Sequence, residues 1–262
     1  LRKGIDHHPA GHFDLFYGKP SEGNAKAAAL HAKNRFTITR QLAYSIDETR
    51  RALDLCLFIN GLPIATFELK NSLTKQTVED AVEQYRRDRN PRERLFEFGR
   101  CVVHFAVDES EVQMCTELRG KGAWFLPFNK GYHDGAGNPP NPHGLKTDYL
   151  WKEVLTPAGL TDILENYAQI VEEKDPRTGR KKRRQVWPRY HQLRLVRQAL
   201  ADVRAHGWPA ARLARLAADH DITPTAAEQA ARMAQAILAG EGAWAWDKAL
   251  IQTAINEAPL HY

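Results

Sequence analysis

The stretch LDLCLFINGLPIATFELKN, residues 53–71, carries the pattern that decides the fold of this chain. Two apolar segments flank the dipeptide Asn60-Gly61, and this dipeptide is a strong signal for a hairpin turn. The pattern therefore predicts two neighbouring antiparallel strands, over residues 51–59 and 63–70.

Three charged residues interrupt these apolar strands: Asp54 in the first, and Glu68 and Lys70 in the second. Glu68 and Lys70 share one face of the sheet because side chains alternate along a strand. A two-residue turn would place Asp54 opposite Phe67, whereas a three-residue loop places Asp54 directly opposite Glu68 and leaves the other face wholly apolar. Since the buried face sets the register, we expect the three-residue loop.

Opposed carboxylates suggest a site for a divalent cation. Directly opposed residues hold their Cβ atoms about 5 Å apart, and two carboxylates at that separation repel unless a cation lies between them. Oxygen ligands suit Mg²⁺, and a nearby lysine can hold or deprotonate one of its waters. Asp54 and Glu68 are therefore the candidate metal ligands, and with Lys70 they predict phosphodiester hydrolysis. A hairpin with one charged surface is the alternative, but it leaves an acid in an apolar strand unexplained.

Working outward from the hairpin, the rest of the chain predicts a mixed α/β domain. Alternation over residues 35–45 predicts a strand, helical spacing over 76–89 an amphipathic helix, and the apolar run 101–107 a buried strand. Residues 1–34 have weak periodicity and are expected to form a flexible terminus. Further expected elements are a strand at 123–128, a loop at 131–146, a helix at 160–171, a charged turn at 172–184, a helix at 188–206, and Ala-rich helices after 208.

Positive charge is concentrated in one segment. Residues 174–197 contain ten basic residues and one acid, whereas the rest of the chain has 27 basic and 31 acidic residues. A phosphate backbone would be attracted to such a segment, although a charge run is also typical of a solvated loop. The densest part is the tetrad Lys181, Lys182, Arg183 and Arg184, which we take as the candidate DNA contacts.

Composition excludes several classes of protein. The chain has 262 residues, 43% of them hydrophobic, and no apolar stretch near the roughly 18 residues that a membrane span needs. The first residues have no apolar core of a secretory signal. Cys56, Cys101 and Cys115 form no C-x-x-C motif, which argues against a disulfide scaffold or a thiolate zinc site. A globular cytoplasmic protein is expected.

Several longer strings resemble a known family. They are NRFTITRQLAYS, LDLCLFINGLPIATFELKNSLT, AVEQYRRDR, WFLPFNKG, GAGNP, TDYLW and WPRYHQLRLVRQAL. Over residues 18–207 the chain resembles the N-terminal nuclease region of the restriction (R) subunit of type I restriction–modification enzymes. This resemblance implies a PD-(D/E)xK nuclease fold, which is a mixed sheet flanked by helices.

The resemblance also implies roles for individual residues. Asp54 and Glu68 correspond to the metal-binding acids, with Mn²⁺ as a substitute for Mg²⁺, and Lys70 corresponds to the motif lysine. Gln84 matches a glutamine that the family places on the next helix, where it positions DNA or the lysine. The family's tyrosine four residues later is Asp88 here, and Tyr85 lies on the apolar stripe of the helix, which favours core packing.

The implied partners are double-stranded DNA and the modification and specificity subunits of a type I complex. The family also has an ATP-powered motor, but this sequence has no G-x-x-x-x-G-K-[ST] loop to bind its phosphates. We therefore expect an endonuclease domain at 1–172, a basic linker and helix at 173–207, an Ala-rich tail at 208–262, and no ATP site. A DNA-binding or assembly module without activity of its own is the alternative.

Overall fold

The computed structural model describes residues 1–206, apart from 46–50, 134 and 175–176. Its contacts divide the chain into two units, residues 1–187 and 188–262. The first unit is an α/β domain, and in the second the helix α4 (Tyr190–His206) is described. The predicted Ala-rich tail lies outside the described residues, and the domain boundaries expected from the sequence stay predictions.

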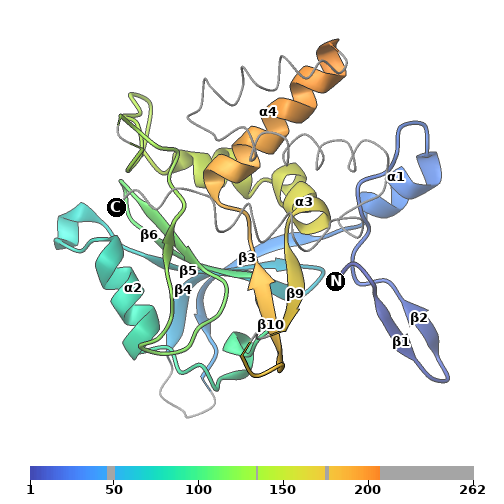
Figure 1. Ribbon diagram of the computed structural model, residues 1–262, viewed down its shortest axis with the longest axis horizontal. Helices are drawn as coiled ribbons and strands as arrows, with labels where there is room; N and C mark the ends of the chain where they lie inside the picture. The colour runs from blue at the N-terminus through green and yellow to red at the C-terminus, as the bar shows by residue number, and fades with distance from the viewer. Residues whose placement is uncertain (46–50, 134, 175–176, 207–262) are drawn as a thin grey trace. The chain divides into compact units, whose positions relative to one another are not determined.

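A six-stranded mixed sheet forms the centre of the first unit, as predicted (Figure 1). Its fourth strand runs parallel to the third, and the remaining neighbours are antiparallel. In spatial order the strands are β3 (Phe36–Ala43), β4 (Ala52–Ile59), β5 (Leu62–Leu69), β6 (Val103–Val107), β7 (Val112–Cys115) and β8 (Leu126–Pro127).

Helices flank this sheet, and side chains of β5 show which segment covers each face. Thr66 points toward α2 (Val78–Arg87), where its hydroxyl lies 2.9 Å from the Tyr85 hydroxyl. Phe67 points the other way, stacks on Phe105 and packs against Trp151 of the short helix η3 (Leu150–Val154). Helix α3 (Pro157–Asn166) follows η3, so α2 and the η3–α3 segment cover opposite faces.

The β4–β5 connection is a tight two-residue turn. Ile59 pairs with Leu62 across the turn, and Asn60 and Gly61 have φ angles of 51° and 82°. Positive φ at both central positions is the geometry that an Asn-Gly pair favours in a hairpin. The expected three-residue loop is therefore wrong.

A β-bulge then restores the register that the buried face requires. The pairing shifts between Leu57 and Phe58, and beyond this point Leu57 pairs with Ala65 and Leu55 with Phe67. These are the pairs predicted from the apolar face. The extra residue that the sequence analysis assigned to the loop is accommodated by the bulge in the strand instead.

Helix α2 connects β5 to β6 and forms as the spacing predicts. The Asp80 carboxylate accepts a 2.7 Å hydrogen bond from the Thr77 backbone N–H, which fixes the start of the helix. The expected apolar positions are buried: Val78, Ala81, Val82 and Tyr85. These apolar side chains pack the helix against the sheet face that carries Thr66 and Glu68.

Other segments differ from expectation. Residues 172–184 are not a charged turn but belong to an antiparallel hairpin of β9 (Gln169–Lys174) and β10 (Lys181–Val186). The helix expected over 160–171 is α3, which ends at Asn166 because the chain turns into β9. The N-terminal segment is ordered into β1 (Ile5–His7), β2 (Gly11–Phe13) and α1 (Ala25–His31).

No helix between residues 1 and 206, outside the gaps given above, is long and apolar enough to cross a membrane. All three cysteines are buried free thiols. Burial raises the pKa of Cys56 to about 12, so its thiol stays protonated and unreactive at neutral pH.

Candidate functional site

Asp54 lies where β4 and β5 stop pairing. Their ladder ends at the Leu55–Phe67 pair, so the expected ladder pair of Asp54 and Glu68 is not formed. The Asp54 side chain instead enters this gap, and its Oδ2 accepts a 2.8 Å hydrogen bond from the backbone N–H of Leu69. The carboxylate therefore replaces a missing strand-to-strand contact at the point where the two strands separate.

Gln41 of β3 holds the other oxygen of Asp54. Its Nε2 donates to Asp54 Oδ1 at 3.2 Å. Gln41 has φ of 48° within a strand, a left-handed conformation that costs free energy in a residue with a side chain. Strain of this kind persists only where the surroundings enforce it, and here it coincides with a contact to a candidate metal ligand.

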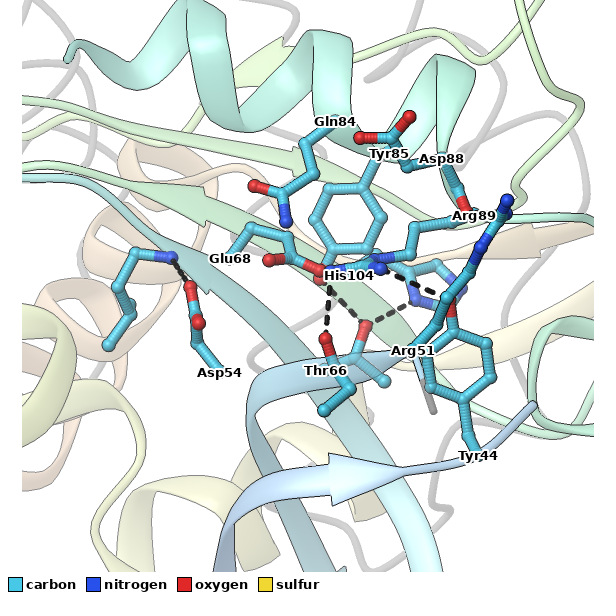
Figure 2. Close-up of polar contacts among 12 residues, drawn as sticks. Tyr44, Arg51, Asp54, Thr66, Glu68, Gln84, Tyr85, Asp88, Arg89 and His104 are labelled. Atoms are coloured by element: carbon cyan, nitrogen blue, oxygen red, sulfur yellow. Dashed lines mark hydrogen bonds and ion pairs between the residues drawn. The ribbon is translucent and has the colours of Figure 1, made fainter. Parts of the chain in front are cut away.

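Glu68 forms an ion pair in the interior of the domain. Its side chain is 0% exposed and that of Arg89 is 5% exposed, with 2.6 Å between Glu68 Oε1 and Arg89 Nε. Figure 2 shows Glu68, Arg89 and Tyr44 together, beside the buried group of Thr66, Tyr85 and His104. Glu68 Oε2 is buried and has no hydrogen-bond partner among the described residues.

The protonation of Glu68 is governed by this burial. Loss of solvation raises the pKa of Glu68 to about 7, although the hydrogen bond and charge of Arg89 act in the opposite direction. Burial lowers the pKa of Arg89, but the bond to Glu68 outweighs it and raises that pKa overall. Arg89 therefore stays charged, and Glu68 is the member of the pair that can change protonation near neutral pH.

Lys70 is held by one contact of its backbone and one of its side chain. Its N–H donates to the carbonyl of Val107 at 2.8 Å, which fixes the end of β5 against β6. Its Nζ donates to Gln84 Oε1 at 2.6 Å. The structure thus brings Gln84 of α2 to the lysine, as the positioning role predicted for it requires.

Comparison with known proteins shows what this segment is similar to. Residues 21–123 match the family model described as type I restriction enzyme R protein N terminus, and they include every residue of the site just described. This segment is similar to that family. A protein of Methanocaldococcus jannaschii named putative type I restriction enzyme MjaIXP endonuclease subunit is 34% identical over 74 residues. The aligned stretch is 27% of this chain and 7% of that relative.

The match confirms the predicted resemblance over the residues of the R protein N-terminal region. Residues 18–20 and 124–207, which the sequence analysis also compared with that family, lie outside the matched stretch. The chain spans a small part of the relative, so the activity and partners of the whole relative come to this chain only as proposals.

Tyr85 serves the core of the domain and not the site, as expected. It is fully buried, and its hydroxyl lies 2.9 Å from Thr66 Oγ1, which in turn lies 2.7 Å from His104 Nδ1. Burial lowers the pKa of His104 to about 3, so its ring is neutral. His104 is therefore a core residue whose ring has a hydrogen-bond partner in Thr66. Asp88, where the resemblance implies a tyrosine, is exposed.

The donor set fits a hard divalent cation. Within the described part of the chain no cluster of three or more His, Cys, Asp or Glu residues can enclose a metal. Mg²⁺ does not need one, since it keeps several waters and binds through one or two carboxylates plus phosphate oxygens. The buried, unpartnered Oε2 of Glu68 is the observation that favours such an ion, because an anionic oxygen without a partner in the interior is costly.

The four predicted DNA contacts are the first four residues of β10. They alternate in side-chain direction, so Lys181 and Arg183 share one face and Lys182 and Arg184 the other. Lys181 pairs with Glu172 at 3.4 Å, and the Arg183 guanidinium lies 5.5 Å from the ring centre of Phe98.

The base of this hairpin is anchored to the main sheet by Gln185. Its Nε2 lies within hydrogen-bond distance of three backbone carbonyls, those of Cys101, Val102 and Thr116, at 2.7, 2.7 and 3.0 Å. The basic tetrad therefore stands on a fixed strand. A strand presents its cations in a defined order, which a flexible linker would not do.

Sequence reasoning missed Arg89 and Gln41. A signal for Arg89 existed: a glutamate in an apolar strand requires a buried cation. The segment RRDRNPR offers four arginines, however, and their spacing alone does not single out the one that turns inward. Gln41 belongs to a correctly predicted strand, and its left-handed backbone has no sequence signal.

Proposed function

We propose that this chain is the endonuclease module of a type I restriction R subunit, which hydrolyses phosphodiester bonds of foreign double-stranded DNA with Mg²⁺, or with Mn²⁺ as a substitute. One observation carries the proposal. Two carboxylates and a lysine from adjacent strands, which the sequence singles out, lie at the point where β4 and β5 separate, and each has a neighbour that fixes it.

The residues divide the chemistry among them. Asp54 and Glu68 would hold the cation, which when bound supplies positive charge for the scissile phosphate. The ammonium of Lys70 has three N–H donors, and the bond to Gln84 leaves two for the attacking water or a phosphate oxygen. Gln84 restricts the position of Lys70 Nζ, and such orientation lowers the entropic part of the barrier.

DNA would reach this site through the basic hairpin. Lys181, Lys182, Arg183 and Arg184 offer positive charge to the phosphate backbone without reading its sequence. Recognition of a specific sequence would then belong to the specificity subunit, with the modification subunit as a second partner in a cytoplasmic complex. ATP-driven movement on DNA is not proposed for this chain, because its sequence lacks the phosphate-binding loop.

A non-catalytic DNA-binding or assembly module is the second candidate. The observation that favours it is Asp88, which stands where the family has a tyrosine. In this case the chain would bind DNA or its partner subunits and would not cut, with or without metal.

Plasmid cleavage separates the two functions. Supercoiled plasmid is incubated with the purified chain and Mg²⁺ or Mn²⁺, alone and with the modification and specificity subunits. We expect metal-dependent nicking that Lys70→Ala abolishes and that Lys26→Ala, a matched change on the exposed helix α1, leaves intact. Intact plasmid in the full complex, or wild-type cutting by Lys70→Ala, would reject the nuclease assignment.

A further inference from the structure

The three nitrogen atoms of the Arg89 guanidinium donate to three different segments of the chain. Nε donates to Glu68 Oε1 on β5 at 2.6 Å, Nη2 to the carbonyl of Ala52 on β4 at 2.9 Å, and Nη1 to the hydroxyl of Tyr44 at 3.2 Å. The guanidinium also lies 5.6 Å from the centre of the Tyr44 ring. Arg89 thus bridges β4 and β5 in the region where their own ladder has ended.

The contact with Glu68 uses one carboxylate oxygen. An arginine facing a carboxylate commonly forms two parallel hydrogen bonds, which occupy both oxygens. Here Nη1 and Nη2 have other acceptors, so Arg89 reaches Oε1 through Nε, and Oε2 has no hydrogen-bond partner among the described residues.

We propose that Arg89 is a positioning residue of the nuclease site, which occupies Oε1 of Glu68 and thereby presents Oε2 as the oxygen that binds the divalent cation. The inference rests on the proposed function, since it assigns a metal to this carboxylate. It goes further in naming the oxygen that is used, and in naming a residue outside the predicted catalytic set that orients it.

The neighbouring arginines show that this role is specific to Arg89. Arg86 and Arg87 both lie on α2 and pair with Glu83 at the surface. Helix α2 ends at Arg87, with Asp88 as its C-cap. Arg89 follows the C-cap, and its side chain is buried in the interior. Only the last of these three side chains reaches the strands that carry Asp54 and Glu68.

The first test measures metal binding directly. The full chain is titrated with Mn²⁺ at one fixed pH, and free Mn²⁺ is followed by its EPR signal. We expect Arg89→Met to weaken Mn²⁺ binding roughly 10- to 100-fold, the range seen when a residue that orients a metal ligand is removed. Arg89→Lys, which keeps one charged donor, should recover part of this loss. Arg87→Met removes an exposed arginine two residues away and should bind as the wild type does.

Two further variants separate positioning from a purely structural role. Tyr44→Phe keeps the ring and the ion pair but removes the acceptor of Nη1, so it should weaken Mn²⁺ binding while the melting temperature stays close to wild type. Arg89→Met with Glu68→Gln removes both charges, and its recovery of the melting temperature would show that the fold does not need the pair.

The outcomes distinguish the inference from the function on which it rests. Wild-type Mn²⁺ affinity in folded Arg89→Met, or in Tyr44→Phe if Arg89→Met does not fold, overturns the positioning role and leaves the metal site standing. If the wild-type chain binds no Mn²⁺, the proposed metal site fails, and the role of Arg89 fails with it.

Discussion

The Asp54 carboxylate accepts a hydrogen bond from the backbone N–H of Leu69, and so joins two strands at the position where their ladder ends. Asp54 therefore has a structural contact as well as a candidate role in metal binding. From its charge alone, removal of Asp54 would be expected to relieve repulsion with Glu68. The contact with Leu69 means that removal also leaves a backbone donor without its acceptor.

Two substitutions of Asp54 separate these contributions. Asp54→Asn keeps an oxygen for the Leu69 N–H and should unfold in urea within about 0.5 kcal/mol of wild type. Asp54→Ala removes the acceptor and should lose about 1 kcal/mol. Both should lose metal-dependent cleavage. An alanine variant as stable as the asparagine variant would show that the Leu69 contact contributes nothing.

Gln84 is expected to act on the rate of cleavage rather than on DNA affinity. Gln84→Ala releases Lys70 Nζ from its 2.6 Å contact, and a mispositioned ammonium should slow cleavage roughly 10- to 100-fold. Single-turnover cleavage and DNA-binding titrations measure the two effects separately. Glu83→Gln, on the same turn of α2 but paired only with surface arginines, is the control. A parallel loss of DNA affinity would make Gln84 a DNA contact instead.

His104 should make the domain less stable in acid. Its folded pKa of about 3 lies below the ordinary value of 6.5, so below pH 6.5 the unfolded chain binds a proton that the folded chain does not. The contribution of neutral His104 to the free energy of unfolding is fully present above pH 6.5. Below that pH it falls by about 1.4 kcal/mol for each pH unit. Glu68 has the opposite sign: its raised pKa favours the folded state in acid, and this gain is lost as the pH rises through about 7.

His104 and Glu68 have opposite effects on how stability changes with pH, so the wild type alone does not separate them. The test therefore compares the wild type with a variant that lacks His104. Urea unfolding of wild type and His104→Gln is measured from pH 7 to pH 4. The difference in unfolding free energy between the two proteins should shrink as the pH falls, because glutamine does not titrate. A difference that stays constant with pH would mean that His104 binds its proton equally well in the folded and the unfolded chain.

The sequence predicted the register of the hairpin but not the way it is reached. Burial of an apolar face selects the pairing of Leu57 with Ala65 and of Leu55 with Phe67, and this preference can be read from alternation. The bulge at Leu57–Phe58 cannot, because a two-residue turn with a bulge and a three-residue loop lead to the same pairs. The preference of Asn60-Gly61 for a two-residue turn selects the turn with a bulge over the three-residue loop.

In the candidate site, too, the sequence predicts the residues but not the tertiary contacts that hold them. Asp54, Glu68, Lys70 and Gln84 follow from residue type, spacing and resemblance, and the structure gives each of them a neighbour. The neighbours Arg89 and Gln41 depend on the direction of a turn after α2 and on one left-handed residue, which are tertiary features. The hairpin of β9 and β10 was missed because KKRRQV has no apolar alternation. Its pairing instead places Glu172 opposite Arg183 and Glu173 opposite Lys182.

The side-chain contacts of β10 make its two faces unequal, which gives a sharper prediction for DNA binding. Lys181 is paired with Glu172 and Arg183 lies over Phe98, whereas neither Lys182 nor Arg184 has an ion pair or side-chain hydrogen bond among the described residues. A cation that already has a partner must give it up to bind a phosphate. We therefore expect Lys182 and Arg184 to make the main phosphate contacts of the tetrad.

Two double variants of equal charge test this preference. Binding of duplex DNA is measured by fluorescence anisotropy over a series of salt concentrations. Each phosphate contact contributes about 0.9 to the slope of log K against log salt, so Lys182→Gln with Arg184→Gln should flatten the slope by about 1.8. Lys181→Gln with Arg183→Gln removes the same charge from the same strand and should change the slope less. Equal effects of the two pairs would mean that DNA responds to net charge alone, and a larger effect of the second pair would place DNA on the opposite face of β10.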